Sequence, residues 1–583
     1  MPIPLLQIRN LEIDFISENG INPVLQNISF EVNQGEILSI VGESGSGKSV
    51  TSLSILGLLP TPPARYNSGK ILFAQPDNRI IDLLECSPLQ MRAIRGNQIA
   101  MIFQEPMSSL NPVFSCGNQV MESIRLHKKL SFKEAKKQAI ELFEKVKLPN
   151  PAEIFSRYPH QLSGGQLQRV MIAIAISCNP TLLICDEPTT ALDVTVQKTI
   201  LELIKELQRT ENMGVIFITH DLGVVAELAD RAVVFYQGKI VEEGEVTSLF
   251  KNPQHPYTKG LLNCRPVLHV KGQRLPIVKD FMVVNEKGNL VEAVQPNYSR
   301  DQQGHTPEQQ ISLTLNQQDT EPLISVENLC IWYVSKRSIL GKPVSYIKAV
   351  DDISFSIFKG ETLGLVGESG CGKTSVGKSL LRLIEPHSGK IMYDGNNLAN
   401  CRQEELKKLR KNLQIVFQDP YSSLNPLITI GSAISEPLQV HRLINTAKKR
   451  KDRTIELLKK VNLEASHYHR YPHEFSGGQR QRIVIARALA LNPSFIICDE
   501  SLSALDVSVQ AQILNLLNEL KKEFGFTIVF ISHDLSVVRY ISDRIIVMNQ
   551  GKIEETGTSE EIYLHPKKEY TRRLIASIPK GIA

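Results

Sequence analysis

One glycine-rich segment, Gly42-Glu43-Ser44-Gly45-Ser46-Gly47-Lys48-Ser49, constrains the fold of this chain more than any other feature. It fits the pattern G-x-x-x-x-G-K-[ST] and follows the apolar run Ile37–Val41, so strand, loop and helix occur in the order that a phosphate-binding loop requires. The glycines let backbone N–H groups turn toward phosphate oxygens, while Lys48 can reach the β- and γ-phosphates and Ser49 can ligate Mg²⁺. The segment therefore predicts a nucleotide site.

The same pattern returns in the second half of the chain. It reads Gly367-Glu368-Ser369-Gly370-Cys371-Gly372-Lys373-Thr374, again after an apolar run (362–366) and before a helical pattern. A single match can arise by chance in a long chain. Two matches, each after a strand, favour two nucleotide sites over two ordinary glycine-rich turns.

The repeat extends well beyond the two loops. Three pairs of residues lie 313 positions apart: Ser163 and Ser476, Glu187 and Glu500, and His220 and His533. The lysines of the loops lie 325 positions apart, and Gln104 and Gln418 lie 314 apart, so the first copy holds about 11 extra residues before Gln104. We expect this insertion in a surface loop around Pro60–Pro63 and the turn that follows.

Length and composition indicate several folded domains. The chain has 583 residues, of which 42% are hydrophobic, whereas a typical domain has about 150 residues. Between the repeats, the composition becomes rich in Gln, Ser, Asp and Thr, although Phe281–Val284 is apolar enough to pack on the first copy. We therefore expect a first domain at 1–279, a flexible Gln-rich linker at 280–322 and a second domain at 323–583.

Within each copy, the hydrophobic pattern is typical of an α/β fold. Apolar runs at 181–185, 215–218 and 232–235 predict strands buried on both faces of a mainly parallel sheet. Between them, Val196–Leu207 places its large apolar residues on one stripe, as an amphipathic helix does.

Other features limit the classes of protein. The N-terminus lacks a basic segment followed by an apolar stretch, and no apolar run reaches about 18 residues, so we expect neither a secreted nor a membrane-spanning chain. Nine scattered cysteines without a C-x-x-C pair indicate reduced thiols in the cytosol. A net charge of +5 without a basic block interleaved with aromatics predicts no nucleic-acid partner.

Paired carboxylates follow an apolar strand in each copy. Asp186 and Glu187 have Asp499 and Glu500 as their counterparts. They are expected at the carboxyl edge of the sheet, where ligands of open α/β sheets bind. An isolated pair is usually a solvated strand end. Two pairs downstream of phosphate loops instead favour Mg²⁺ binding by the aspartate and orientation or deprotonation of the attacking water by the glutamate.

A Ser-Gly-Gly-Gln turn precedes a helical stretch in each copy, at Ser163-Gly164-Gly165-Gln166 and Ser476-Gly477-Gly478-Gln479. Such a turn can offer N–H groups and a positive helix end to an anion, and it can also be a plain helix cap. Together with the preceding motifs, it resembles the signature of ABC-type ATPases. The resemblance covers nearly the whole chain apart from the linker.

This resemblance implies a detailed architecture. Two P-loop domains, each a mainly parallel sheet with a helical subdomain and an antiparallel β edge, would face head to tail, each ATP lying between one phosphate loop and the opposite signature. Site one would comprise Lys48, Ser49, Gln104, Asp186, Glu187 and His220 with Ser476, Gly477 and Gly478. Site two would comprise Lys373, Thr374, Gln418, Asp499, Glu500 and His533 with Ser163, Gly164 and Gly165.

The resemblance also implies roles. Gln104 and Gln418 resemble the glutamines that sense Mg²⁺ and the attacking water, and His220 and His533 resemble the switch histidines near the γ-phosphate. Asp193 and Asp506 match the D-loop, and Phe15 and Tyr333 match the aromatic that stacks on adenine. The Mg²⁺ ligands would be Ser49, Gln104 and Asp186 in one site and Thr374, Gln418 and Asp499 in the other.

Both sites are expected to be competent, because both glutamates and both Ser-Gly-Gly-Gln turns are present. The nearby differences are Leu162 against Phe475 and Pro188 against Ser501. A histidine cluster at His467, His469 and His473 resembles a metal-ligand run. Two of its members have no counterpart in the first copy, so a zinc site is disfavoured. His160 aligns with His473, and we expect this pair to be structural or to lie near the signature turns.

Three stretches indicate which ABC subfamily this chain resembles. Phe103–Pro112 and His255–Leu262 look like the oligopeptide, dipeptide and nickel importer ATPases, and Tyr471–Arg482 is similar to the fused glutathione and microcin importer ATPases. Many relatives carry a cysteine cluster after the His-Pro-Tyr-Thr stretch. Here Cys264 stands alone in that region, so we expect no iron-sulfur cluster.

The sequence therefore predicts the ATP-binding and ATP-hydrolysing subunit of a peptide importer. It would lie peripherally at the cytoplasmic face of the inner (plasma) membrane with two integral-membrane permease subunits and a substrate-binding protein. The main alternative is a soluble tandem ABC ATPase acting on ribosomes or DNA. That class usually has a highly charged helical linker and lacks the Ser-Ser-Leu-Asn-Pro and His-Pro-Tyr-Thr stretches, whereas this linker is Gln-rich and polar and both stretches are present. A nucleotide-gated scaffold is disfavoured because neither copy has lost its Lys, Asp, Glu or His.

Overall fold

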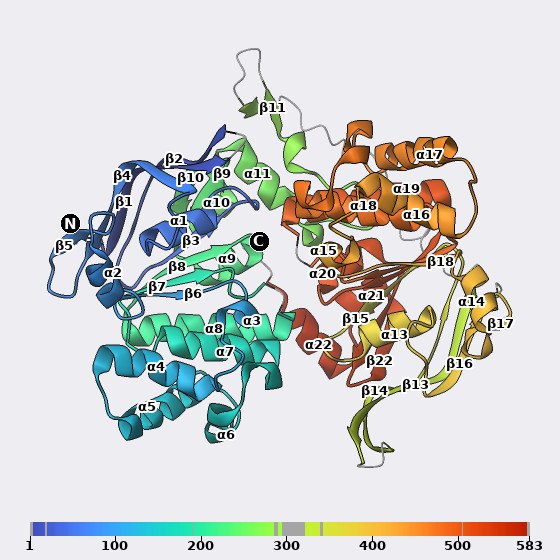
Figure 1. Ribbon diagram of the computed structural model, residues 1–583, viewed down its shortest axis with the longest axis horizontal. Coiled ribbons are helices and arrows are strands. Elements are labelled where there is room, and N and C mark those ends of the chain that lie inside the picture. Colours follow the sequence, from blue (N-terminus) through green and yellow to red (C-terminus); the bar gives the residue numbers. More distant parts are fainter. Residues whose placement is uncertain are drawn as a thin grey trace.

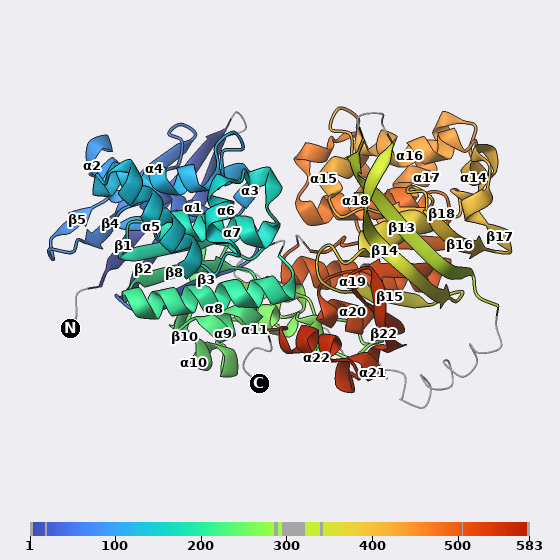
Figure 2. The same cartoon turned by 90° about the horizontal axis from the view of Figure 1, so that it is seen from below.

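The computed structural model describes residues 4–17, 20–190, 192–284, 290–293, 321–338, 342–503 and 505–579. Within these ranges the chain forms two α/β halves of the same architecture, one on each side of Figure 1, with the first half ending at 293 and the second beginning at 321. Figure 2 shows the same two halves from below.

A six-stranded sheet forms the centre of the first half, in the order β10-β9-β3-β8-β7-β6. Its strands are β3 (Ile37–Val41), β6 (Ile99–Ile102), β7 (Leu182–Asp186), β8 (Gly214–Thr219), β9 (Arg231–Tyr236) and β10 (Lys239–Glu245). All neighbours run parallel except β10, which pairs antiparallel with β9 at one edge. Every residue of β3, β7 and β8 is buried, as expected for strands covered on both faces.

A second, antiparallel sheet has the order β2-β1-β4-β5. It consists of β1 (Leu6–Ser17), β2 (Gly20–Val32), β4 (Ala64–Ala74) and β5 (Ile80–Asp82). Apolar side chains of both sheets share one core. The predicted insertion is divided between two places. Gly69 packs against Leu11 as Gly389 packs against Leu329, so these glycines are equivalent, and part of the insertion precedes Gly69. The rest lies in the turn between β4 and β5.

The helices of the first half are α1 (Lys48–Ile55), α2 (Pro88–Ile94), α3 (Pro106–Ser109), α4 (Cys116–Lys128), α5 (Phe132–Lys145), α6 (Pro151–Ser156), α7 (Gly164–Ala175), α8 (Val194–Glu211), α9 (Leu222–Leu228), α10 (Val246–Lys251) and α11 (Pro256–Asn263). Helices α4 to α7 form a helical subdomain around a second core. The predicted stripe of α8 buries Ile200, Leu203, Ile204 and Leu207, as expected for an amphipathic helix.

The second half repeats this plan. Its antiparallel sheet contains β13 (Ile324–Arg337), β14 (Pro343–Ile357), β16 (Ser388–Tyr393) and β17 (Asn396–Asn397), and its central sheet contains β15 (Thr362–Val366), β18 (Leu413–Val416), β19 (Phe495–Asp499), β20 (Thr527–Ile531), β21 (Arg544–Asn549) and β22 (Lys552–Thr558). Its helices are α13 (Lys373–Leu380), α14 (Gln403–Leu409), α15 (Pro420–Ser423), α16 (Ile430–Val440), α17 (Ala447–Lys460), α18 (Gly477–Leu489), α19 (Val507–Phe524), α20 (Leu535–Ile541), α21 (Ser559–Leu564) and α22 (Glu569–Ala576).

The beginning of the predicted linker belongs to ordered structure. Asp280 and Phe281 are buried, and β11 (Met282–Val284) pairs with β12 (Leu290–Glu292). Residues 285–289 and 294–320 of the linker lie outside the described residues, so its flexibility stays a prediction.

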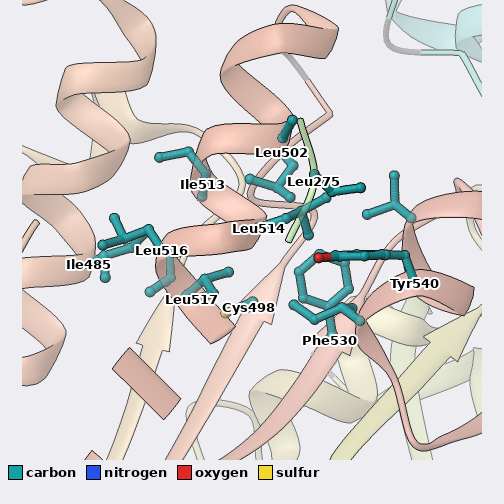
Figure 3. Packing of buried hydrophobic residues seen from close by; sticks show 14 of the residues in the cluster. Leu275, Ile485, Cys498, Leu502, Ile513, Leu514, Leu516, Leu517, Phe530 and Tyr540 are labelled. Carbon is teal, nitrogen blue, oxygen red and sulfur yellow. The ribbon is translucent and has the colours of Figure 1, made fainter. Parts of the chain in front are cut away.

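A segment after α11 crosses from the first half into the core of the second. Leu275 lies among Leu514, Tyr540 and neighbouring apolar side chains in Figure 3. Its backbone N–H donates to Asn515 Oδ1 at 2.9 Å, and Asn515 Nδ2 donates to its carbonyl at 2.8 Å. At the other end of the chain, Pro579 packs against Gly223 of the first half. The two halves are thus joined by reciprocal crossovers.

A search of the described helices finds none with enough length and apolar character to span a bilayer.

Candidate nucleotide sites

The phosphate loop of the first half connects β3 to α1. Gly42 and Gly47 have φ angles of 153° and 104°, and a Cβ on Gly42 would lie 2.3 Å from the carbonyl oxygen of Phe235. Glycine is therefore required where the loop approaches β9. Lys48 is buried, which lowers the pKa of its ammonium, and its Nζ donates to the carbonyls of Gly42 at 2.7 Å and Glu43 at 3.0 Å.

The predicted Mg²⁺ ligands Ser49 and Asp186 meet at the carboxyl edge of the central sheet. Ser49 Oγ donates to Asp186 Oδ1 at 3.1 Å. Burial raises the pKa of Asp186 to about 6. A hydroxyl and a carboxylate at hydrogen-bonding distance form the oxygen donor set that suits Mg²⁺.

Three donors converge on one oxygen of Glu187. Gln104 Nε2 lies 3.2 Å, Thr190 Oγ1 3.0 Å and His220 Nδ1 3.2 Å from Glu187 Oε2. The backbone of Glu187 has φ 46°, a left-handed conformation that non-glycine residues seldom adopt. Its N–H donates to the carbonyl of Ile218 in the adjacent strand β8 at 3.0 Å, so this bond fixes the turn directly after β7.

Neighbouring charges shift the pKa values of Glu187 and His220. Burial alone would raise the pKa of Glu187, but the hydrogen bond and charge of His220, with the charge of Lys48, lower it. Burial alone would lower the pKa of His220, but Glu187 and the more distant Asp506 raise it. The glutamate is therefore held ionised beside a histidine that readily accepts a proton.

The second half builds the same arrangement. Thr374 Oγ1 donates to Asp499 Oδ1 at 3.0 Å, and Lys373 Nζ donates to the carbonyls of Gly367 at 2.8 Å and Glu368 at 2.9 Å. Burial raises the pKa of Asp499. Glu500 repeats the left-handed backbone with φ 45°.

The carboxylate of Glu500 has a looser set of neighbours. Gln418 Nε2 donates to its Oε2 at 2.9 Å, His533 Nδ1 lies 3.7 Å away and Lys373 Nζ lies 3.9 Å from Oε1. Burial alone would raise its pKa, but His533 and Lys373 lower it.

A hydroxyl next to each glutamate distinguishes the two sites. Thr190 donates to the carboxylate of Glu187, whereas the equivalent Ser503 donates to the backbone carbonyl of Glu500 at 3.0 Å. The sequence comparison singled out Pro188 against Ser501 instead. In the structure, it is the Thr190 and Ser503 pair that changes the contacts of the carboxylate itself.

Two buried tyrosines support the phosphate loops, and the sequence analysis missed this role. Tyr257 OH accepts a hydrogen bond from the Glu43 N–H at 3.0 Å, and Tyr570 OH accepts one from the Glu368 N–H at 3.1 Å. Tyr257 belongs to the His-Pro-Tyr-Thr stretch, which served only as a subfamily marker. The recurrence of Tyr-Thr 313 residues later was the available signal.

Asp506 of the second half reaches the phosphate loop of the first. Its carboxylate accepts from Ser44 N–H at 3.0 Å and from Ser44 Oγ at 3.2 Å. Its counterpart Asp193 instead caps its own helix by accepting from Val196 N–H at 2.9 Å. Among the described residues no hydrogen bond joins Asp193 to Ser369, so the two halves contact each other unequally.

The two Ser-Gly-Gly-Gln turns are helix caps. Ser163 Oγ accepts from Gln166 N–H and Ser476 Oγ accepts from Gln479 N–H, and each glutamine bonds back to the serine N–H. Their second glycines pack against Val196 and Val509, where a Cβ would approach within 2.6 and 2.4 Å. Within the described ranges no hydrogen bond joins either turn to the opposite phosphate loop.

The other residues that the sequence singled out are the two aromatics and the histidines. Tyr333 is 39% exposed, and its OH lies 3.1 Å from Ser375 Oγ at the start of α13. Phe15 is half-buried against the core of the first half. His467 packs edge-on against Phe475, and His473 stacks on Tyr471 as His160 stacks on Tyr158. His160 and His473 thus make matching ring contacts, and their role stays a prediction.

Two protein-family models and several known proteins match this chain. The sequence model of the ABC transporter family matches residues 25–190 and 350–503, and that of the oligopeptide/dipeptide transporter C-terminal region matches 241–284. The chain is similar to the glutathione import ATP-binding protein GsiA of Pectobacterium atrosepticum, at 46% identity, and of Escherichia coli strain K12, at 47%. Both alignments cover 99% of this chain and 89% of the relative.

A solved dimeric ATP-binding cassette in a post-hydrolysis state with ADP and Pi is 31% identical, with a TM-score of 0.37, over 40% of this chain and 98% of that one.

Proposed function

The chain belongs to the ABC transporter family, and on that premise we propose that it is the ATP-hydrolysing, energy-coupling subunit of an importer for peptides or glutathione-like substrates. One observation carries the proposal: a single chain holds two complete sets of phosphate-loop, carboxylate and histidine residues and also the peptide-transporter region at 241–284. The import of glutathione named for its relatives makes a small peptide the first substrate to test.

At the first site, each residue has a defined chemical task. The N–H groups of the loop 42–49 and the Lys48 ammonium would bind the β- and γ-phosphates. Ser49 and Asp186 would hold Mg²⁺, which would offset the negative charge of the phosphates when bound. Gln104, whose amide contacts Glu187 here, would be the third residue near the metal.

Glu187 would orient the attacking water and accept its proton. Its carboxylate is ionised and fixed by three donors, so it meets the requirements for a general base. His220 would stabilise that geometry and the γ-phosphate from the other side. The matching tasks at the second site fall to Lys373, Thr374, Gln418, Asp499, Glu500 and His533.

We further propose that ATP brings the two halves together head to tail. Ser476, Gly477 and Gly478 would complete site one, and Ser163, Gly164 and Gly165 would complete site two, with Phe15 and Tyr333 stacking on the adenines. The contact between Asp506 and Ser44 supports this arrangement, because it already sets a D-loop against the opposite phosphate loop.

The partners would be two integral-membrane permease subunits and a substrate-binding protein, with the chain peripheral at the cytoplasmic face of the membrane. Exposed apolar residues follow both glutamines: Met107, Val113 and Phe114 in the first half, and Tyr421 and Leu427 in the second. These two surfaces are the proposed docking sites for the permeases. No iron-sulfur cluster is proposed.

Purification and activity together test this function. The chain should co-purify from detergent-extracted membranes with two small integral subunits, and that complex should import labelled glutathione or dipeptides with ATP. Glu187→Gln or Glu500→Gln should lower hydrolysis at the altered site by about 10² to 10⁴, since each removes a general base. Recovery of the chain only with ribosomes or DNA, or import unaffected in the double variant, would refute the proposal.

A further inference from the structure

A cavity of about 160 Å³ with both polar and apolar lining residues lies between the two halves. It is lined by the two predicted switch histidines, His220 and His533, by the aspartates that follow them, Asp221 and Asp534, and by Arg265. We call the pairs His220-Asp221 and His533-Asp534 the switch loops. The cavity therefore brings together the switch loops of both nucleotide sites.

The two aspartates occupy equivalent places. Asp221 Oδ1 accepts from Gly223 N–H at 2.8 Å at the start of α9, and Asp534 Oδ1 accepts from Ser536 N–H at 2.8 Å at the start of α20. Burial raises the pKa of Asp534, and the charge of Asp221 raises it further, although His533 acts in the opposite direction. Both carboxyl groups therefore line the same cavity where the halves meet.

Arg265 is a cation that only the first half supplies. It follows α11, is 8% exposed, and begins the crossover segment that packs against the second half. Burial lowers its pKa, while Asp221 and Asp534 both act to raise it. The equivalent position in the second half is Ile578, which also lines the cavity and carries no charge.

We propose that Arg265 is a positioning residue that holds the two switch loops together by neutralising Asp221 and Asp534 across the interface of the halves. This rests on the proposed assignment of His220 and His533 to the ATP sites. When ATP draws the halves together, the two carboxylates approach, and an unpaired buried charge would oppose closure. One side chain of the first half would thereby couple the closure of both sites.

The charge balance of the cavity makes this role specific. The charged or titratable groups facing Arg265 are Asp221, Asp534, His220 and His533. The other polar lining residues, among them Thr189, Gln197 and Gln510, carry no charge. Arg265 is the cationic side chain, other than the histidines, that lines this cavity within the described residues.

The test uses the full chain and compares single and compensating variants. Arg265→Met should lower kcat for ATP about tenfold, leave KM within about twofold and bring the Hill coefficient toward one, because coupling of about 1.4 kcal/mol between sites corresponds to a factor of ten. Arg265→Lys keeps the charge and should retain most of the rate. Asp534→Asn in the Arg265→Met background should restore the rate, since asparagine still caps α20 without the charge.

Lys271→Met is the matched control. Lys271 lies in the same crossover segment and forms an ion pair with Asp543, outside the cavity. Its loss should change kcat by less than about twofold, and Asp534→Asn should not compensate for it. Arg265→Met could also lower kcat by reducing folding, which its thermal midpoint would show. In that case the comparison is made in the Asp221→Asn/Asp534→Asn variant, where adding Arg265→Met should have no further effect on kcat.

The outcomes separate this inference from the proposed function. If the parent hydrolyses ATP but Arg265→Met matches it, or Arg265→Lys is as slow as Arg265→Met, or Asp534→Asn restores nothing, the positioning role is wrong and the proposed function stands. If Glu187→Gln with Glu500→Gln leaves ATPase activity intact, the site assignment is wrong and this inference falls with it.

Discussion

Replacing Thr190 by valine should slow hydrolysis at the first site selectively. Thr190 Oγ1 donates to Glu187 Oε2 at 3.0 Å, and valine keeps the shape of threonine without the hydroxyl. The equivalent Ser503 donates to a backbone carbonyl instead, so Ser503→Ala should leave the carboxylate contacts of Glu500 unchanged. The pair forms a matched comparison in which each variant loses one hydroxyl next to a glutamate that we propose to be catalytic.

The expected size follows from the other donors on the same oxygen. A hydrogen bond to a charged group contributes about 1.5 to 3 kcal/mol. Because Gln104 and His220 still donate to Glu187 Oε2, we take the lower end of this range. About 1.4 kcal/mol corresponds to a tenfold change in rate, so Thr190→Val should cost roughly tenfold at site one. Loss of the donor also raises the pKa of Glu187, which shifts the acidic limb of the pH profile upward.

The assay is steady-state ATP hydrolysis against pH for the parent, Thr190→Val, Thr190→Ser and Ser503→Ala, repeated in a Glu500→Gln background that isolates site one. Thr190→Ser keeps the hydroxyl and should behave as the parent. Independent sites predict that Thr190→Val alone retains roughly half of the total rate, whereas coupled sites predict a larger loss. Equal slowing by Ser503→Ala, or a parent-like rate for Thr190→Val in the isolating background, would refute the reasoning.

Three further outcomes are expected. Tyr257→Phe leaves the Glu43 N–H without its acceptor and should reduce the free energy of unfolding by about 1 to 3 kcal/mol, read by denaturant titration, with Tyr570→Phe acting likewise on the second loop. Burial alone would raise the pKa of Asp543, but Lys271 and Lys521 lower it. Lys271→Met should therefore be less stable than the parent near neutral pH, and this difference should disappear as the pH falls below about 4. Thermal melts across pH measure the difference. Limited proteolysis should cut first within 280–322 and leave two stable halves, whereas early cleavage inside either half would contradict a flexible linker.

The unequal contacts of the two halves bear on how the sites would work together. Asp506 bonds to Ser44, but Asp193 caps its own helix, and Arg265 has Ile578 as its counterpart. Each difference adds a contact around the first site or at the interface that the second copy lacks. Measurements on single-site variants should therefore treat the two sites as chemically similar and structurally distinct.

Local patterns determined much of this protein in advance. The two phosphate loops, the strands before them and the carboxylates Asp186 and Asp499 were predictable, because a loop motif and an apolar run each depend on residues adjacent in sequence. The repeat of two halves followed from the spacing of these motifs, whereas the ABC family was expected from a resemblance of the motifs themselves. The Ser-Gly-Gly-Gln turns were recognisable, although each taken alone was more typical of a plain helix cap than of an anion site.

Tertiary structure alone decided which distant side chains meet. The hydroxyl of Tyr257 supports Glu43 from 214 residues away, and Asn515 binds the backbone of Leu275 from 240 residues away. Even Thr190 and Ser503, which follow glutamates with the same left-handed backbone, differ in the acceptor that their hydroxyls bind. Such contacts depend on how layers pack and on where a crossover segment ends. A linear pattern encodes the period of each element, but the partner of each buried polar group is set only when the elements assemble.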